Sequence, residues 1–431
     1  ASKPMRGVSA DGLSTVILKI GLQSMVQSVT VSLPTSPCGS DSISVNDSCG
    51  SLFRLGSVVP ETSVQLTADP LSQEPVVFLA YRAPVDFNWG SEQMDLPERT
   101  VNLTIRRFGI DEVFPIIIRR PPVVLIHGNW SNRSAWNHVD VSDDILKRFA
   151  TYRADYSAQM ADGIAGGATS VIDTIKSSVA SYAKTFGVAT AQVSVVAYSM
   201  GGLVAREIAQ DKDVLADSFM NKGYIHKMVT MDSPHTGSEF ANRLYNSSAR
   251  CRDMFTARGS VVGKNIRDLS VGSEAIKKLS KLQVDTPKVR VHAIRSSASD
   301  VQRKAAEDNY SYFDAKLVGL GMRYWYSCDL LPDDGFEGLL GTDSDLIVSR
   351  DSQVGRGLSL EVSNVPSSSV GGDFVHAVDN TLFTVGPSIL GETIDGKQKV
   401  KHVSSERIRN HLIDRLNRRA NDRSVYREML P

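Results

Sequence analysis

The sequence lacks both an apolar run long enough to cross a bilayer and an excess of charge of either sign. No stretch approaches the roughly 18 consecutive apolar residues that mark a membrane-spanning helix. Lysine and arginine together number 48, aspartate and glutamate also number 48, and no basic run stands out. We therefore expect no transmembrane segment and no nucleic-acid partner, and the balanced charge argues against a polyanionic substrate.

Cysteine is scarce as well, with four residues among 431. No Cys-x-x-Cys pair or Cys/His cluster is present, so we expect no structural zinc, no other metal and no cofactor. Cys38 and Cys49 flank a polar loop that cannot build a core of its own, and a disulfide between them would stabilise that loop by restricting the unfolded chain. We predict this bridge, and the pairing of Cys251 with Cys328 stays open.

The N-terminus has neither an initiator methionine nor the apolar region of a signal peptide. With the even number of cysteines, this predicts a processed protein that is secreted or otherwise extracytoplasmic.

Residues 1–117 have the pattern of an all-β unit. Valine, threonine, isoleucine and leucine alternate with polar residues across 13–33 and 64–118, and turn residues separate the runs. About 115 residues of this kind suit a small β-sandwich. We therefore predict an N-terminal, sandwich-like accessory domain over 1–117, with no cluster of polar residues that would indicate chemistry.

From about residue 118 the pattern changes to alternating strands and helices, which is typical of a parallel sheet with crossover helices. The expected strands and helices lie at 148–153, 164–186, 193–198, 201–210, 225–231 and 288–294, with helical residues over 239–284 and a last helix at 405–418.

The strand at 193–198 runs directly into Ser199 and then into a helix. A nucleophile on such a tight strand-to-helix turn has a strained backbone and needs small neighbours. Ala197 and Gly201 are those neighbours, so the motif is A-x-S-x-G rather than the commoner G-x-S-x-G. The amide groups at the start of the helix would face an oxyanion formed at Ser199.

Two further segments accompany this turn. Residues 121–130 read PPVVLIHGNW, an apolar strand that ends in a loop, and residues 231–238 read MDSPHTGS. Together the three segments resemble the bacterial lipases and esterases of the α/β-hydrolase fold, from about residue 118 to the C-terminus. The resemblance implies an α/β-hydrolase catalytic domain over 118–431 with a helical cap or insert within 239–338, although the same helices could simply pack on the core.

The resemblance also implies an oxyanion hole made by the backbone amides of Asn129 and Met200. Trp130 is expected to border the substrate pocket, with packing at the surface as the equal alternative.

In the fold that the resemblance implies, the remaining partners of Ser199 follow it in the chain, first an acid and then a histidine. Residues 341–353 resemble the lipase segment that carries the acid, and the match places it on Asp345. Leu346 stands where glycine is usual, so Asp343 remains the alternative.

Three histidines follow Asp345. His411 lies inside the predicted last helix and is a poor candidate. His376 lies about 30 residues after Asp345, a gap that suits one helix and one strand, so it is preferred to His402 as the base.

The resemblance implies a serine carboxylic-ester hydrolase, a lipase or esterase that works through an acyl-enzyme on Ser199. Its substrate would be an ester or a lipid, in solution, at an interface or on a polymer surface. A non-catalytic binding protein on the same fold, or an acyltransferase or amidase with the same triad, are the alternatives. Acyl-chain length and oligomeric state cannot be read from the sequence.

Overall fold

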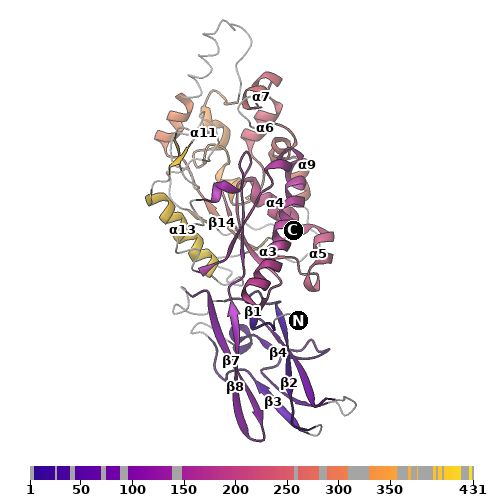
Figure 1. The fold of residues 1–431 in the computed structure, drawn as a ribbon. Coiled ribbons are helices and arrows are strands. Elements are labelled where there is room, and N and C mark those ends of the chain that lie inside the picture. The colour runs from indigo at the N-terminus through magenta and orange to yellow at the C-terminus, as the bar shows by residue number, and fades with distance from the viewer. Residues whose placement is uncertain are drawn as a thin grey trace.

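The computed structural model describes residues 4–24, 27–38, 44–68, 74–87, 96–137, 148–256, 261–280, 289–308, 330–356, 367–369, 376, 392–394, 397–399, 402–418 and 427–429. The molecule is elongated, with a β-rich part at one end and an α/β part at the other (Figure 1). Among the described residues, no helix has the length and apolarity of a membrane span.

The β-rich part contains two sheets on one shared core. Alternation along each strand places apolar side chains on the inner face, and the core holds Leu52 and Leu79 of one sheet beside Val31 and Leu103 of the other. This confirms the sandwich-like β part predicted from the sequence. Its elements are β1 (Gly7–Ser9), β2 (Thr15–Gly21), β3 (Ser28–Ser32), α1 (Val45–Cys49), β4 (Ser51–Arg54), β5 (Ser63–Thr67), β6 (Val76–Arg82), β7 (Glu98–Arg107) and β8 (Ile110–Arg119).

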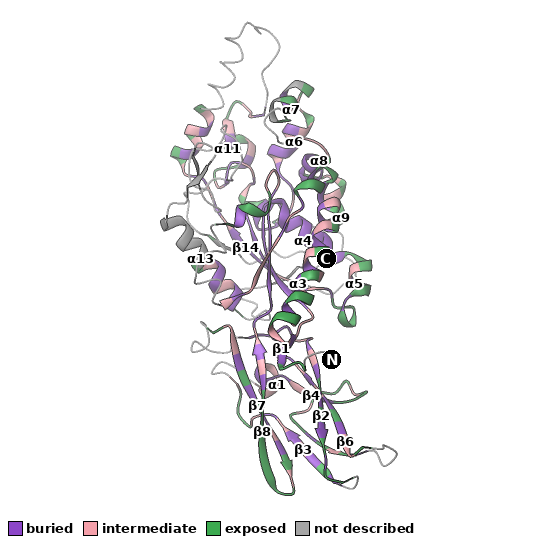
Figure 2. Cartoon of the chain, viewed as in Figure 1, coloured by how far each residue is buried: buried purple, intermediate pink, exposed green. Residues whose placement is uncertain are grey.

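The two sheets differ in size. The smaller has the order β2-β6-β4, and the larger has the order β11-β1-β8-β7-β3-β5, in which β11 (Val188–Ala189) comes from the α/β part of the chain. The far end of the β7–β8 hairpin is exposed (Figure 2).

The predicted disulfide between Cys38 and Cys49 is present, with an S–S distance of 1.97 Å. It closes the loop that leads into α1, whose N-cap is Ser44. Cys251 is also disulfide-bonded, and Cys328 lies outside the described residues.

The α/β part is built on a sheet with the order β10-β9-β12-β13-β14-β15, in which all neighbours are parallel, and β18 joins β14 in the antiparallel sense. The strands are β9 (Val123–Ile126), β10 (Thr151–Ala154), β12 (Val193–Tyr198), β13 (Ile225–Met231), β14 (Val289–Arg295), β15 (Ser367–Ser369) and β18 (Arg427–Met429).

Helices cover both faces of this sheet. One face packs against α3 (Gly163–Phe186) and α4 (Met200–Gln210), and the other packs against α13 (His402–Asn417). The central strands are buried on both sides, which explains why β9, β12 and β13 read as continuous apolar runs (Figure 2). The α/β-hydrolase architecture expected from the sequence is confirmed.

The remaining elements lie around the sheet, and α6 and α7 lie near the end of the molecule farthest from the β-rich part (Figure 1). The expected helical stretch after β13 is present as four short helices. Residues 257–260, 281–288 and 309–329 of the predicted cap lie outside the described residues. The remaining elements around the sheet are η2 (Arg133–Trp136), η3 (Ser157–Asp162), α5 (Lys212–Asp217), η4 (Phe219–Asn221), α6 (Glu239–Asn246), α7 (Ala249–Thr256), α8 (Lys264–Leu269), α9 (Glu274–Ser280), α11 (Gly335–Leu340), α12 (Arg350–Gln353), β16 (Glu392–Ile394) and β17 (Lys397–Lys399).

The β-rich part contacts the α/β part at the start of β12, the strand that leads to Ser199. β1 pairs in parallel with both β8 and β11. The carboxylate of Asp11 accepts hydrogen bonds from the amides of Ala191 and Gln192, each at 3.1 Å, immediately before β12 begins. The two parts of the chain therefore share backbone pairing and a buried carboxylate.

Candidate active site

Ser199 lies on a strained turn between β12 and α4. Its backbone has φ 52° and ψ −127°, a conformation that non-glycine residues rarely adopt. The turn brings the following helix close to the end of β9, since a Cβ atom placed on Gly201 would lie 2.5 Å from the carbonyl oxygen of His127. The position therefore requires glycine, while Ala197 is fully buried in the core below.

Ser199, His376 and Asp345 are joined by hydrogen bonds. His376 Nε2 lies 2.8 Å from Ser199 Oγ, and His376 Nδ1 lies 2.8 Å from Asp345 Oδ2. All three side chains are buried. An ionised carboxylate can only accept, so Nδ1 is the donor to Asp345 and Nε2 is left to accept the hydroxyl proton of Ser199.

The loop before α12 holds Asp345 in one orientation. Its Oδ1 atom accepts from the amides of Ile347 at 3.0 Å and Val348 at 2.7 Å, which leaves Oδ2 directed at His376. The amide of His376 donates to the carbonyl oxygen of Asp345 at 2.7 Å. Leu346, which stands where glycine is usual, has φ 76° and is buried. The leucine therefore adopts the positive φ that a glycine would adopt at this position.

The alternative candidates lie elsewhere. The Asp343 carboxylate forms ion pairs with Arg295 at 3.2 Å and Arg350 at 3.0 Å. His402 is the first residue of α13, and His411 lies within that helix. Among the described residues, the preferred acid Asp345 and the preferred base His376 are thus hydrogen-bonded to each other, whereas the alternative acid Asp343 is paired with arginines.

The loop after β9 lies against Ser199. A Cβ atom on Gly128 would lie 2.9 Å from Cβ of Ser199, so the backbone here approaches the nucleophile as closely as glycine allows. Asn129 and Trp130 follow and line the same cavity as Ser199. Met200 is the first residue of α4 and is fully buried.

Helix α8 and the residues before it hold this loop in place. Asn265 Nδ2 donates to Asn129 Oδ1 at 2.8 Å, and Trp130 Nε1 donates to the carbonyl oxygen of Val261 at 2.7 Å. Trp130 has φ 55°. The segment predicted as a cap is therefore hydrogen-bonded to the loop predicted to supply an oxyanion donor.

A cavity open to solvent reaches Ser199 and His376, with about 490 Å³ of empty space when the solvent at its mouth is included. Its walls are mainly apolar side chains of α6, α8 and the loop after Asp345. These are Phe240, Ala241, Leu244, Ile266, Leu269, Ile347 and Val348. Such a surface suits a hydrocarbon chain better than a charged group.

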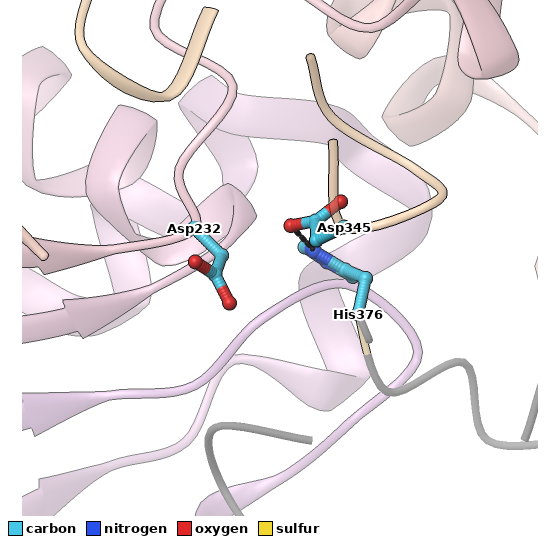
Figure 3. Close-up of side chains that lie close together, drawn as sticks. All are labelled: Asp232, Asp345 and His376. Carbon is cyan, nitrogen blue, oxygen red and sulfur yellow. Dashed lines mark hydrogen bonds and ion pairs between the residues drawn. The ribbon is translucent and has the colours of Figure 1, made fainter. Parts of the chain in front are cut away.

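A second carboxylate, Asp232, lies beside Asp345 and His376 (Figure 3). Sequence reasoning included it in the segment MDSPHTGS but gave it no role. The signal that could have found it is its position, because it directly follows β13 at the edge of the sheet where Ser199 follows β12.

Burial and charge oppose each other at these groups. Burial alone would lower the pKa of His376, but the charge and hydrogen bond of Asp345 and the charge of Asp232 raise it above the ordinary value. Burial, and then the nearby Asp345, raise the pKa of Asp232 to about 7, while His376 and the bonds from Ser296 act in the opposite direction.

Asp232, Asp345 and His376 each offer one ligand atom within 4.8 Å of the others, the spacing of a metal-binding group. However, both ring nitrogens of His376 already form hydrogen bonds, to Asp345 and to Ser199. While these bonds are formed, neither ring nitrogen of His376 is available to an ion.

Comparison with known proteins agrees with this architecture. Residues 122–282, which include the loop after β9, Ser199 and the helices through α9, match the family described as "Putative serine esterase (DUF676)". A comparison with curated proteins gives no match.

Several solved structures are similar. The mature lipase BlEst2 of Bacillus licheniformis is 16% identical over 62% of this chain and 86% of its own, with a TM-score of 0.35. EstA of Clostridium botulinum is 15% identical over 57% of this chain and 76% of its own, with a TM-score of 0.31. Phospholipase PlaB of Legionella pneumophila is 13% identical over 54% of this chain and 45% of its own, with a TM-score of 0.33. By the family match, the chain resembles the serine esterases over residues 122–282, and its parallel sheet with helices on both faces has the architecture of the α/β-hydrolase fold.

Proposed function

We propose that this protein is a serine carboxylic-ester hydrolase whose nucleophile is Ser199. The observation that carries the proposal is the pair of 2.8 Å contacts that link Ser199, His376 and Asp345 at the end of an apolar cavity. A serine hydroxyl is a weak nucleophile unless a base removes its proton, and His376 Nε2 is in position to do so.

In the proposed reaction Ser199 Oγ attacks the acyl carbon while His376 accepts the hydroxyl proton. The backbone amides of Met200 and Asn129 stabilise the oxyanion. His376 then donates the proton to the leaving alcohol, and a water molecule, activated by the same imidazole, releases the acid from Ser199. Asp345 holds the imidazole in the required tautomer, and Trp130 borders the acyl group.

The same groups could serve acyl transfer to an alcohol or amide cleavage, and a fold of this kind could also bind a ligand without turnover. The apolar walls of the cavity and the family match favour an ester with a hydrocarbon acyl chain. We infer that residues 118–431 form the catalytic domain, with a cap within 239–338, and that 1–117 form an accessory domain.

We also infer that the protein works outside the reducing cytoplasm. The support is the disulfide between Cys38 and Cys49, since structural disulfides persist mainly in oxidising compartments.

The test is covalent labelling combined with a substrate series. A fluorophosphonate should add one label to the protein, and peptide mapping should place it on Ser199. Ser199→Ala should lose both the label and the hydrolysis of p-nitrophenyl esters, while Ser177→Ala, an exposed serine on α3, should keep both. A chain-length series measured below and above substrate solubility identifies the preferred acyl group. Labelling of another residue, or turnover by Ser199→Ala, would refute the proposal.

A further inference from the structure

Asp232 is a buried carboxylate that the triad described above does not use. It directly follows β13, is 1% exposed, and has φ 49°. Its side chain lies beside those of Asp345 and His376 (Figure 3), and one ligand atom of each residue lies within 4.8 Å of the others. The histidine is therefore flanked by two carboxylates.

The protein holds this carboxylate firmly. The amide of Ser296 donates to Oδ1 at 2.9 Å, and the hydroxyl of Ser296 donates to Oδ2 at 2.8 Å. The amide of Asp232 donates to the carbonyl oxygen of Ile294, at the end of β14. Each of these bonds ties Asp232 to the end of the neighbouring strand β14, so the sheet fixes the position of its carboxylate.

Asp232 does not reach the substrate. The cavity is lined by Ser199 and His376, whereas neither Asp232 nor Asp345 is among the residues that line it. Any effect of Asp232 on the reaction therefore passes through His376.

The reaction places a positive charge on this buried imidazole. Once His376 has accepted the proton of Ser199 it is an imidazolium ion, and a buried cation needs nearby negative charge. Asp345 supplies one charge through its hydrogen bond. Asp232 adds a second at a distance where two charges still interact strongly in a medium of low polarity.

Building on the proposed function, we propose that Asp232 is a positioning residue for His376, a second carboxylate that stabilises its protonated form and partly replaces Asp345 when that residue is removed. The charged groups that act on Asp232 in the structure are Asp345, from the loop before α12, and His376. The pKa of Asp232, raised to about 7 by burial and Asp345, places its ionisation in the same range as that of the histidine it faces.

The competing explanation is that Asp232 only anchors the end of β14. Asp232→Asn separates the two roles. The asparagine oxygen can still accept from the amide of Ser296, and its amide can donate to the Ser296 hydroxyl, so the anchor survives while the charge is lost.

The experiment is a double-mutant cycle of Asp232→Asn and Asp345→Asn, with kcat/KM measured on one p-nitrophenyl ester across pH. In serine hydrolases, loss of the acid lowers kcat by about 10⁴. We expect a loss of only about 10²-fold for Asp345→Asn, about 10-fold for Asp232→Asn, and about 10⁴ or more for the double variant, which exceeds the product of the single effects.

The pH profile gives a second readout. Removing the negative charge of Asp232 should lower the pKa of His376, so the acidic limb of kcat/KM in Asp232→Asn should move to lower pH. Losses that simply multiply, together with an unmoved limb, would overturn the proposal. Asp343→Asn is the matched control, because that carboxylate pairs with Arg295 and Arg350; it should leave the limb in place.

Two measurements keep the test decisive. If Asp232→Asn does not fold, Asp232→Ser removes the same charge with a smaller side chain and enters the same cycle. Labelling of Ser199 and wild-type turnover are measured first. Their absence refutes the proposed function, whereas an active, labelled enzyme with independent losses refutes the role of Asp232 alone.

Discussion

Gly201→Ala tests whether the close packing around the turn at Ser199 sets the rate. The added Cβ atom would lie 2.5 Å from the carbonyl oxygen of His127 and 2.8 Å from that of Ile126. Both are backbone atoms at the end of β9, so they must retreat by about 0.6–0.9 Å to reach the 3.4 Å of an ordinary contact. The His127 carbonyl also accepts the hydroxyl of Tyr156 at 2.8 Å, which resists that movement.

Two effects on stability oppose each other. Alanine is favoured over glycine within a helix by about 1 kcal/mol, and Gly201 lies in the first turn of α4. Overpacking against a rigid backbone costs about 1–3 kcal/mol. The clash is with backbone rather than with a flexible side chain, so we expect the second effect to prevail, with a net loss of up to about 2 kcal/mol.

The effect on turnover should be larger. A shift of His127 carries Gly128 and Asn129 with it, and the Asn129 amide is the proposed oxyanion donor. Because removal of one such donor typically lowers kcat by about 10²–10³, we expect kcat/KM to fall by about 10² while thermal denaturation still shows a cooperative transition.

The matched control is Gly21→Ala. Gly21 ends β2 on the surface, and a Cβ atom there would meet nothing within 4 Å. That variant should keep full turnover and unchanged or slightly raised stability. A folded Gly201→Ala protein with kcat/KM within about threefold of wild type would refute the link between this contact and the oxyanion loop.

Three further outcomes follow from the structure. Asn265→Ala removes the 2.8 Å bond to Asn129 and should lower kcat by about 10-fold with a smaller change in KM, whereas a rise in KM alone would show that Asn265 only shapes the cavity. The imidazole of His376 must be neutral to accept a proton, and its pKa is raised, chiefly by Asp345 against the opposing effect of burial. We therefore expect kcat/KM to fall as pH drops through a midpoint above the ordinary pKa of histidine; a midpoint below that value would contradict the assignment of His376. Cys38→Ser opens a disulfide loop with a sequence separation of 11, and in denaturant titrations the free energy of unfolding should fall by about 2–3 kcal/mol. Turnover at low temperature should not change, and an unchanged free energy of unfolding would contradict a stabilising role of the disulfide.

The strands and the serine turn could be predicted because their signals are local. The predicted strand at 225–231 has the bounds of β13, and the predicted helices at 164–186 and 201–210 each begin within one residue of the observed start. Apolar runs of this length, ended by small residues, leave little choice of secondary structure. The strand expected at 148–153 lies instead at 151–154, because polar and apolar residues mix there and local pattern defines the ends poorly.

Features that depend on contacts between distant residues could not be predicted. β11 is two residues long and exists only because β1 lies beside it. The bond between Asn265 and Asn129 joins residues 136 positions apart. The interest of Asp232 lies in its hydrogen bonds to Ser296 and its closeness to His376. Both residues are far from Asp232 in the sequence, so the sequence does not show that they lie near it.

Backbone strain marks the same site without reference to any family. Among the described residues, seven that are not glycine have positive φ, and four of these are Trp130, Ser199, Asp232 and Leu346. They come from four separate loops: Trp130 and Ser199 line the cavity, Leu346 lies between Asp345 and the cavity-lining Ile347, and Asp232 has a carboxylate oxygen within 4.8 Å of ligand atoms of Asp345 and His376. Such conformations cost about 1–3 kcal/mol apiece and persist where the surrounding structure enforces them. Asp232 shares both the positive φ and the burial of Ser199 and of Leu346 beside Asp345, as expected of a residue that the surrounding structure holds in place.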